Sequence, residues 1–172
     1  MGRTQHPVLT PQSPQPPELV ARFDALPREA RDAAYEDRIK RTYPIHPELF
    51  DTLYEEWSSL ERFQRTRGVL RLMSTVIHAL WTGEDQSPMI MPASIPLATS
   101  NVNSELTQYL QDSWKAIIDA DVDGSNSEPA RIDKEKPLFG QRALTKRLAR
   151  TVFFGAAPTI APGSVHKGIG TQ

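Results

Sequence analysis

The segment from Gln64 to Trp81 constrains the fold more than any other part of the chain, because it has the pattern of one long amphipathic helix. Its apolar residues recur with the 3.6-residue period of an α-helix, and a set of polar residues falls on the opposite stripe. The apolar positions are Val69, Leu70, Leu72, Met73, Val76, Ile77, Leu80 and Trp81, and the polar ones are Arg67, Arg71, Ser74, Thr75 and His78. A helix of this kind buries its apolar face against other helices. The pattern therefore predicts a mainly α fold, a helical bundle that carries a basic stripe on one helix.

Residues on and beside this stripe are candidates for a binding function. Arg65, Arg67 and Arg71 supply guanidinium groups, whose fixed N–H donors match phosphate oxygens. Gly68 lies between them, and a glycine lets another group approach the backbone closely. These residue types predict a surface that contacts phosphate. The same pattern is also typical of a solvated helix face with ordinary surface arginines, so the residues alone leave both interpretations open.

Composition excludes several classes of protein. The chain has no cysteine, which removes disulfides, thiolate chemistry and cysteine-based zinc sites. Its net charge of −1 provides no global field for nucleic acid or an acidic membrane, so any such contact would need a local patch. The sequence shows no basic leader followed by an apolar run and no apolar stretch long enough to cross a bilayer. These features predict a cytoplasmic protein that makes no membrane contact.

The distribution of the 15 prolines predicts a helical core between loose ends. Residues 1–17 hold five prolines among polar residues, which predicts a disordered lead. Two helical regions follow, a subdomain at residues 18–83 and a second module at residues 84–158 that contains an acidic loop. Residues 159–172 are predicted to form a flexible tail.

Five helices are expected within those regions, with ends set by proline, glycine and capping residues around each apolar stripe. They are a helix from about Arg28, one from Glu48 to about Ser58 that follows Pro47, the helix that ends near Gly83, one from Asn103 or Ser104 to about Ile118, and one from Gln141 to about Phe154. Between them, residues 88–100 are predicted to form an extended, partly buried connector and residues 119–137 the acidic loop.

The start of the acidic loop copies the first half of a calcium-binding loop. Asp119, Asp121 and Asp123 take positions one, three and five, and Gly124 takes the position of the sharp turn. Position twelve is Ala130, so the bidentate carboxylate that completes the cation shell is missing. An acidic surface turn is therefore favoured over a calcium site.

The last predicted helix is basic, with Arg142, Lys146, Arg147 and Arg150 around its polar side. One interpretation is contact with phosphate or DNA. Six acidic residues lie immediately upstream, between Asp119 and Glu135, and can neutralise the helix. An internal network of ion pairs is the preferred interpretation.

The sequence offers no candidate catalytic residue and no metal ligand set. The four histidines are scattered, and none has the spacing that presents two imidazoles to one metal. No Gly-x-Ser-x-Gly turn occurs, and no Gly-x-x-x-x-Gly-Lys-Ser/Thr loop is present to hold nucleotide phosphates. We expect the chain alone to be inactive as an ATPase.

Several long motifs nevertheless resemble a known family. The runs Tyr43–Trp57 and Phe63–Leu72 resemble the large predicted ATPases of the domain of unknown function 499 family. The likeness continues through Asp121–Gly124, Pro129–Asp133 and Ala149–Pro158, in the same order, and covers about residues 28–158. Proteins of that family are AAA+-like P-loop ATPases, often encoded beside DNA methyltransferases and helicases in bacterial phage-defence islands.

The resemblance implies a role for the basic stripe. In such ATPases a helical lid follows the P-loop core and commonly carries a Gly-x-x-Arg whose arginine senses the γ-phosphate, and Gly68 to Arg71 looks like that element. Arg65 and Arg67 become secondary contacts in the same pocket or a neighbouring subunit. The residues at the lid entry would pack on the adenine side; they are Tyr43, Pro44, Ile45 and His46.

The same resemblance also implies partners. The Walker motifs that the family carries upstream are missing, so the chain would be a lid fragment from a truncated or split gene, working with a P-loop ATPase core in cis or in trans. ATP and Mg²⁺ would then be cofactors only in a full-length homologue. A DNA methyltransferase or helicase of the same system is a further implied partner. The alternative is a helical protein-interaction module with no nucleotide role.

Overall fold

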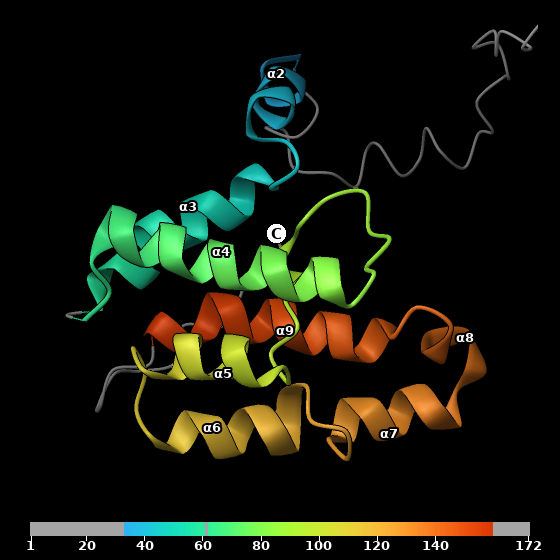
Figure 1. Ribbon diagram of the computed structural model, residues 1–172. Coiled ribbons are helices and arrows are strands. Elements are labelled where there is room, and N and C mark those ends of the chain that lie inside the picture. The colour runs from blue at the N-terminus through green and yellow to red at the C-terminus, as the bar shows by residue number, and fades with distance from the viewer. Residues whose placement is uncertain (1–32, 61, 160–172) are drawn as a thin grey trace, which may run out of the picture. The chain divides into compact units, whose positions relative to one another are not determined.

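The computed structural model describes residues 33–60 and 62–159 of the chain (Figure 1). Within these residues the chain is mainly α-helical, as the amphipathic patterns predict. The α-helices are α2 (Ala33–Thr42), α3 (Pro47–Glu55), α4 (Arg65–Thr82), α5 (Ser100–Thr107), α6 (Ser113–Ile117), α7 (Glu128–Glu135), α8 (Pro137–Gly140) and α9 (Leu144–Ala156). The predicted lead at residues 1–17 and the helix start near Arg28 lie outside the described residues, as does the tail beyond Thr159.

The chain divides into two compact units after Asp37. The first unit is represented only by residues 33–37, which form the first half of α2. The second unit runs from Arg38 and contains α3 to α9. All of the contacts discussed below belong to this second unit.

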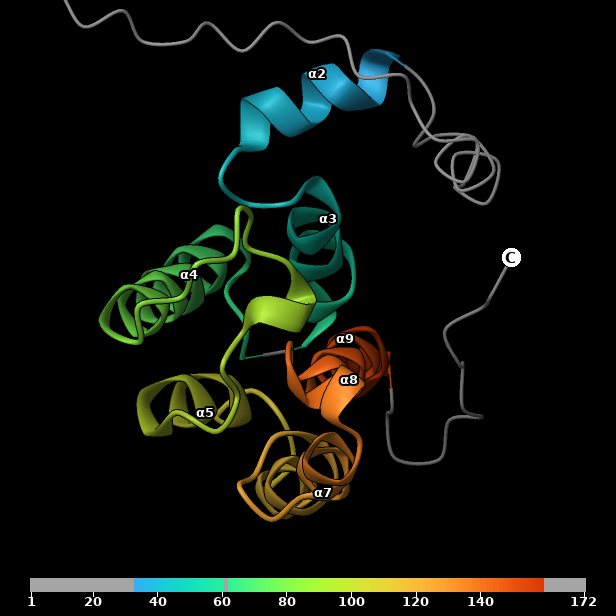
Figure 2. The same ribbon diagram turned by 90° about the vertical axis from the view of Figure 1, so that its right-hand side faces the viewer.

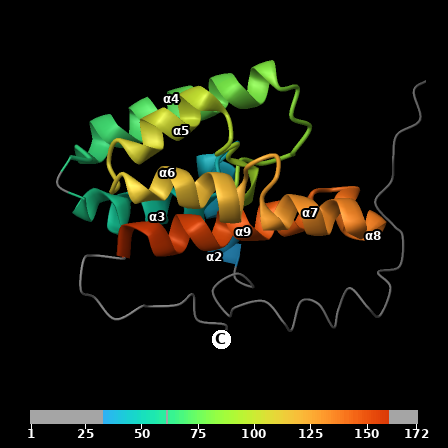
Figure 3. The ribbon, with the colours of Figure 1, turned by 90° about the horizontal axis from the view of Figure 1, so that it is seen from below.

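In the second unit α4 contacts α3 and α5, and α9 contacts α7 (Figures 1 and 3). The connector between α4 and α5 passes between these helices (Figure 2). It contains the short 3₁₀ helix η3 (Pro92–Ser94), which packs against α9. Ile95 and Leu97 of the connector are fully buried. The extended, buried connector predicted from its prolines is therefore present, and it fills the centre of the bundle.

The hydrophobic core joins both predicted regions of the chain. It draws on α3 and α4 from residues 18–83 and on the connector, α5, η4 and α9 from residues 84–158. Trp57, fully buried, donates a hydrogen bond from its indole N–H to the carbonyl of Phe154 at 3.0 Å, and the two rings lie 5.1 Å apart. Because these contacts cross the boundary at residues 83 and 84, the two predicted regions share one core.

Two of the predicted elements are different in the structure. The single helix expected between Asn103 and Ile118 is split, because α5 packs on α4 whereas the π-helix η4 (Ile118–Val122) after α6 packs on α9. The acidic loop expected at residues 119–137 is mostly helical: it holds most of η4 and all of α7, and α8 begins at its last residue. Ser127 begins α7 by accepting a hydrogen bond from the Ala130 N–H at 3.4 Å, with a proline in the first turn.

Several predicted apolar positions lie on the surface. On α4 the residues Leu70, Ile77 and Trp81 are exposed, and Trp81 is 84% accessible. On α9 the stripe of Leu144, Leu148 and Val152 is likewise exposed, because the helix packs instead through Phe153 and Phe154. A further difference is the start of α9, three residues later than predicted, after a left-handed residue at Ala143.

Asp123 links the acidic segment to the last helix. Its carboxylate is fully buried, with Oδ1 at 2.9 Å from Lys146 Nζ and 2.7 Å from Arg150 Nη2. Oδ2 accepts the Ala98 backbone N–H at 2.9 Å. Two of the four basic residues of the last helix are thus engaged inside the domain, which confirms the predicted ion-pair network. A third, Arg147, donates to Ser87 Oγ at 3.4 Å, and DNA contact by this helix remains a prediction.

The start of α9 is stabilised by a residue from another helix. Ala143, at the N-cap, provides no side-chain acceptor. Asp133 of α7 accepts the backbone N–H groups of Thr145 and Lys146 at 3.0 and 3.2 Å, which satisfies donors that a helix start leaves unpaired. Burial raises the pKa of Asp133, but the hydrogen bonds from Thr145 and Lys146 outweigh it and the pKa is lowered.

Candidate functional site

Arg71 lies in the second turn of α4 and faces outward. Its side chain is 63% exposed, and Nη2 lies 3.2 Å from Oε2 of Glu105 on α5. A buried guanidinium locked to a carboxylate would exclude a binding role for Arg71. The observed group is instead held on one side by Glu105 and open to solvent on the other.

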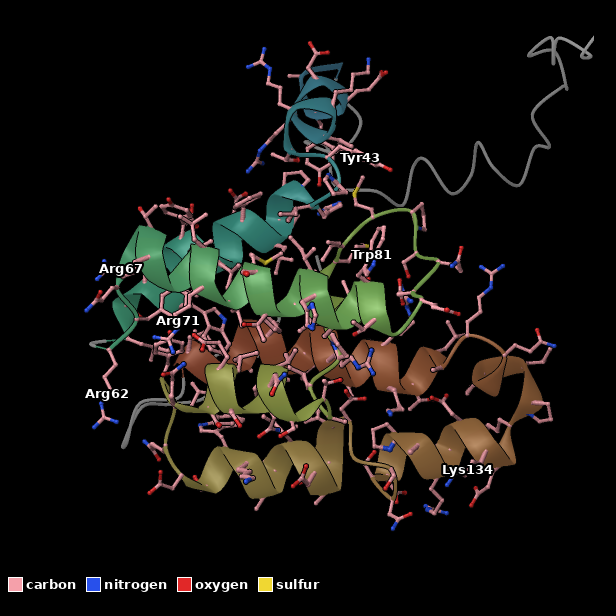
Figure 4. All side chains as sticks on the ribbon, viewed as in Figure 1. Tyr43, Arg62, Arg67, Arg71, Trp81 and Lys134 are labelled. Carbon is pink, nitrogen blue, oxygen red and sulfur yellow. The ribbon has the colours of Figure 1, made fainter. Side chains whose placement is uncertain are left out.

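Three arginines line one groove beside α4, and Figure 4 shows them at the same end of that helix. The groove has a volume of about 420 Å³ and is lined by Arg62, Gln64, Arg67, Gly68, Arg71, Gln108 and Tyr109. Within the described part of the chain, Arg62 and Arg67 make no ion pair. We call this groove the arginine groove. Among the side chains that the structure describes, Glu105 is the acidic partner of the three arginines, through its ion pair with Arg71.

Gly68, which lines the arginine groove, allows α4 to pack closely against Phe63. A Cβ at this position would lie 3.1 Å from the ring of Phe63, closer than ordinary van der Waals contact. Phe63 in turn packs edge-on against Tyr109, with the ring centroids 4.9 Å apart. The absence of a side chain at Gly68 therefore makes room for the Phe63 ring, a packing role that the sequence did not indicate. Gly68 also lines the arginine groove, where it adds no side chain.

A second polar groove lies on the other side of Arg71. It has a volume of about 550 Å³ and is lined by Arg71, Ser74, Thr75, His78, Asn101, Ser104, Glu105 and Gln108. Four of these residues belong to the polar stripe predicted for α4, and the others come from α5 and the turn after it. Arg71 stands between the two grooves and lines both.

The electrostatics of the site depend on a pair of residues that the sequence did not single out. Glu105 is 9% exposed, and its Oε1 accepts a hydrogen bond from the Tyr109 hydroxyl at 2.8 Å. Burial raises the pKa of Tyr109 to about 12; the Glu105 carboxylate adds to the increase and Arg71 opposes it. In the sequence, the only feature that could have pointed to Glu105 is its position as an acidic residue beside the apolar residues of α5.

The remaining predicted site residues lie elsewhere. Tyr43, Pro44, Ile45 and His46 line neither groove, and Figure 4 shows Tyr43 toward the opposite end of α4 from Arg62 and Arg67. Two backbone hydrogen bonds join this segment to Ile90: the His46 N–H donates to the Ile90 carbonyl at 2.9 Å, and the Ile90 N–H donates to the Pro44 carbonyl at 2.8 Å. His46 also caps α3 by accepting the Glu48 N–H at 3.2 Å. The structure therefore does not bring the predicted adenine-side residues to the arginines.

Two other candidates can be placed only in part. Arg65 is the first residue of α4, but its side chain is not among those that the structure describes. Of the calcium-like aspartates, Asp123 is engaged by Lys146 and Arg150. Among the described residues, no three histidine or acidic side chains gather as a metal site. Gly124 permits a close approach, because a Cβ there would lie 1.9 Å from the carbonyl oxygen of Asp119.

The comparison with protein families decides the affiliation of the chain. The family model described as DUF499 second domain matches residues 28–167. The chain belongs to the DUF499 family. The match extends over the whole of the arginine groove, so the groove is part of the DUF499 second domain. No curated protein and no solved structure shows a significant match. In the described part of this domain, no helix is both long enough and apolar enough to cross a membrane.

Proposed function

We propose that the arginine groove of this DUF499 second domain senses the terminal phosphates of ATP bound by a P-loop ATPase core, in the same protein or in a partner. The observation that supports the proposal is that Arg62, Arg67 and Arg71 all line one groove. Three guanidinium groups provide fixed N–H donors for phosphate oxygens, and one acidic side chain compensates them only in part.

The groove acts as a lid sensor in this proposal. Arg71 approaches the γ-phosphate when the domain closes on the core, and closure weakens after hydrolysis because the negative charge is lost. The chain itself contains no P-loop, so ATP and Mg²⁺ are bound by the core and the second domain supplies the response. We further propose that this ATPase works in a phage-defence or DNA-modification system, with a DNA methyltransferase or helicase as a further partner; the resemblance described above supports this part of the proposal.

A DUF499 protein that contains the Walker motifs tests the proposal. We expect Arg71→Ala at the corresponding position to lower the ATP turnover rate about 100-fold, the effect of removing one donor from a developing charge. The matched control is Lys134→Ala on α7, which removes a cation outside both grooves (Figure 4). Full turnover in an Arg71→Ala variant that keeps the thermal unfolding midpoint of the wild type would refute the sensor.

The exposed apolar stripe on α4 favours a second candidate, a helical interaction module with no nucleotide role. Leu70, Ile77 and Trp81 recur at i, i+7 and i+11 and are 65%, 44% and 84% exposed. Exposed apolar patches of this kind mark protein contacts. If the domain is only a scaffold, Trp81→Ser weakens association with the ATPase core while Arg71→Ala leaves turnover unchanged.

A further inference from the structure

We infer that Glu105 is a specificity-determining residue of the arginine groove: it occupies Arg71 until a doubly charged phosphoryl group displaces it, and so excludes singly charged anions. This inference rests on the proposed function, since it concerns the ligand of the same groove. Glu105 comes from α5 and lines the second polar groove, so it contacts Arg71 from the side opposite the arginine groove; its Oε2 lies 3.2 Å from Arg71 Nη2.

The physical reason is an exchange of anions at Arg71. A carboxylate or chloride from solvent carries the same single charge as Glu105, so displacing Glu105 gains no Coulomb energy and leaves a buried carboxylate without its cation. A terminal phosphoryl group carries nearly two charges and three acceptor oxygens. It attracts Arg62, Arg67 and Arg71 together, and that gain offsets the loss of the Glu105 contact.

Tyr109 makes the exchange tolerable. Its hydroxyl donates to Oε1 of Glu105 at 2.8 Å, on the oxygen that Arg71 does not contact. When Arg71 turns to a phosphoryl group, this hydrogen bond remains and still satisfies the Glu105 carboxylate. Glu105 and Tyr109 are therefore positioning residues with opposite effects: loss of the Glu105 charge strengthens anion binding, and loss of the Tyr109 hydroxyl weakens it.

The test is a titration of the 172-residue chain, followed by NMR at low ionic strength. Tripolyphosphate is the probe that presents a terminal phosphoryl group with nearly two charges, and acetate is the singly charged probe. We expect millimolar binding of tripolyphosphate to the wild type, its loss in Arg71→Ala, and no binding of acetate. Glu105→Gln should bind tripolyphosphate about fivefold more tightly and should now bind acetate, because about 1 kcal/mol of competing ion pair is gone. Tyr109→Phe should bind tripolyphosphate several-fold more weakly.

Glu128→Gln is the matched control, because it removes the same charge from an exposed glutamate on α7 that pairs with Arg131. It should bind both probes as the wild type does. Suppose that tripolyphosphate binds in a way that depends on Arg71, and that Glu105→Gln binds tripolyphosphate and acetate just as the wild type does. That result would overturn this inference but would not contradict the phosphate sensor. No tripolyphosphate binding to the wild type or to Glu105→Gln would contradict the phosphate contact itself. Should Glu105→Gln fail to fold, stronger binding by Tyr109→Phe would still overturn the inference.

Discussion

Asp123→Ala is expected to destabilise the domain severely, because Asp123 is the buried partner of two cations. Lys146 and Arg150 lie 2.9 and 2.7 Å from the same oxygen and are only 22% and 17% exposed. Removing the carboxylate leaves both cations partly buried without an anion. The Arg150 guanidinium keeps one hydrogen bond, from Nη1 to the Ala93 carbonyl at 3.3 Å, but its buried Nε already has no hydrogen-bond partner.

The expected loss in unfolding free energy is about 3–4 kcal/mol. Breaking a fully buried pair costs about 3–5 kcal/mol, and we take the lower part of that range because both cations retain some solvent access. The Ala98 N–H also loses its acceptor, but Ala98 is exposed and water can replace the carboxylate. For a domain of this size the loss corresponds to about 10–15 °C in the unfolding midpoint.

Urea unfolding followed by circular dichroism measures this change. Asp121→Ala is the matched control, since Asp121 lies two residues earlier in the same segment, is exposed, and should change stability by less than about 0.5 kcal/mol. Asp123→Asn, which keeps an acceptor for the Ala98 N–H but loses the charge, should fall between the two. A loss below about 1 kcal/mol in Asp123→Ala would refute the reasoning that this carboxylate stabilises the packing of α9.

Two smaller changes follow from the local structure. Ala143 has φ +48°, a left-handed conformation that costs an alanine about 1 kcal/mol, so Ala143→Gly should raise the unfolding free energy by up to that amount in the same urea assay; a loss would contradict it. The pKa of Tyr109 is raised in the folded state from its ordinary value of 10.0 to about 12. The native state therefore holds that proton more tightly, so the stabilisation is complete below about pH 10 and disappears as the pH rises to about 12. The stability difference between the wild type and Tyr109→Phe should shrink over this window, and a constant difference would show that the hydroxyl does not titrate as described.

Local sequence patterns were sufficient to predict the helix of the site. Periodicity placed the helix at residues 64–81, and it runs from Arg65 to Thr82 with Gly83 after its last residue. The same periodicity put Arg71, Ser74, Thr75 and His78 on one polar stripe, and these side chains line one groove. Such patterns succeed because residues three and four apart on a helix are neighbours whatever the rest of the chain does.

The groove itself required the tertiary structure. Arg62 precedes the helix and Glu105 lies on α5, so nothing in the local sequence could bring either one to Arg71. The same holds for Trp57 and Phe154, which are hydrogen-bonded across 97 positions of the chain. The exposed side chain of Trp81 was assigned to the core because an apolar stripe shows that a face can be buried but not which part of it another helix covers.

The sequence by itself determined which segments become helices and which face of α4 is polar, since both depend on neighbours within one or two turns. Only the tertiary structure decided that three arginines share one groove and that one buried carboxylate, Glu105, opposes them. These contacts depend on how α4, α5 and the preceding turn pack around a common core. Many apolar contacts between residues far apart in the chain determine that packing, so no single segment of the sequence is sufficient to predict it.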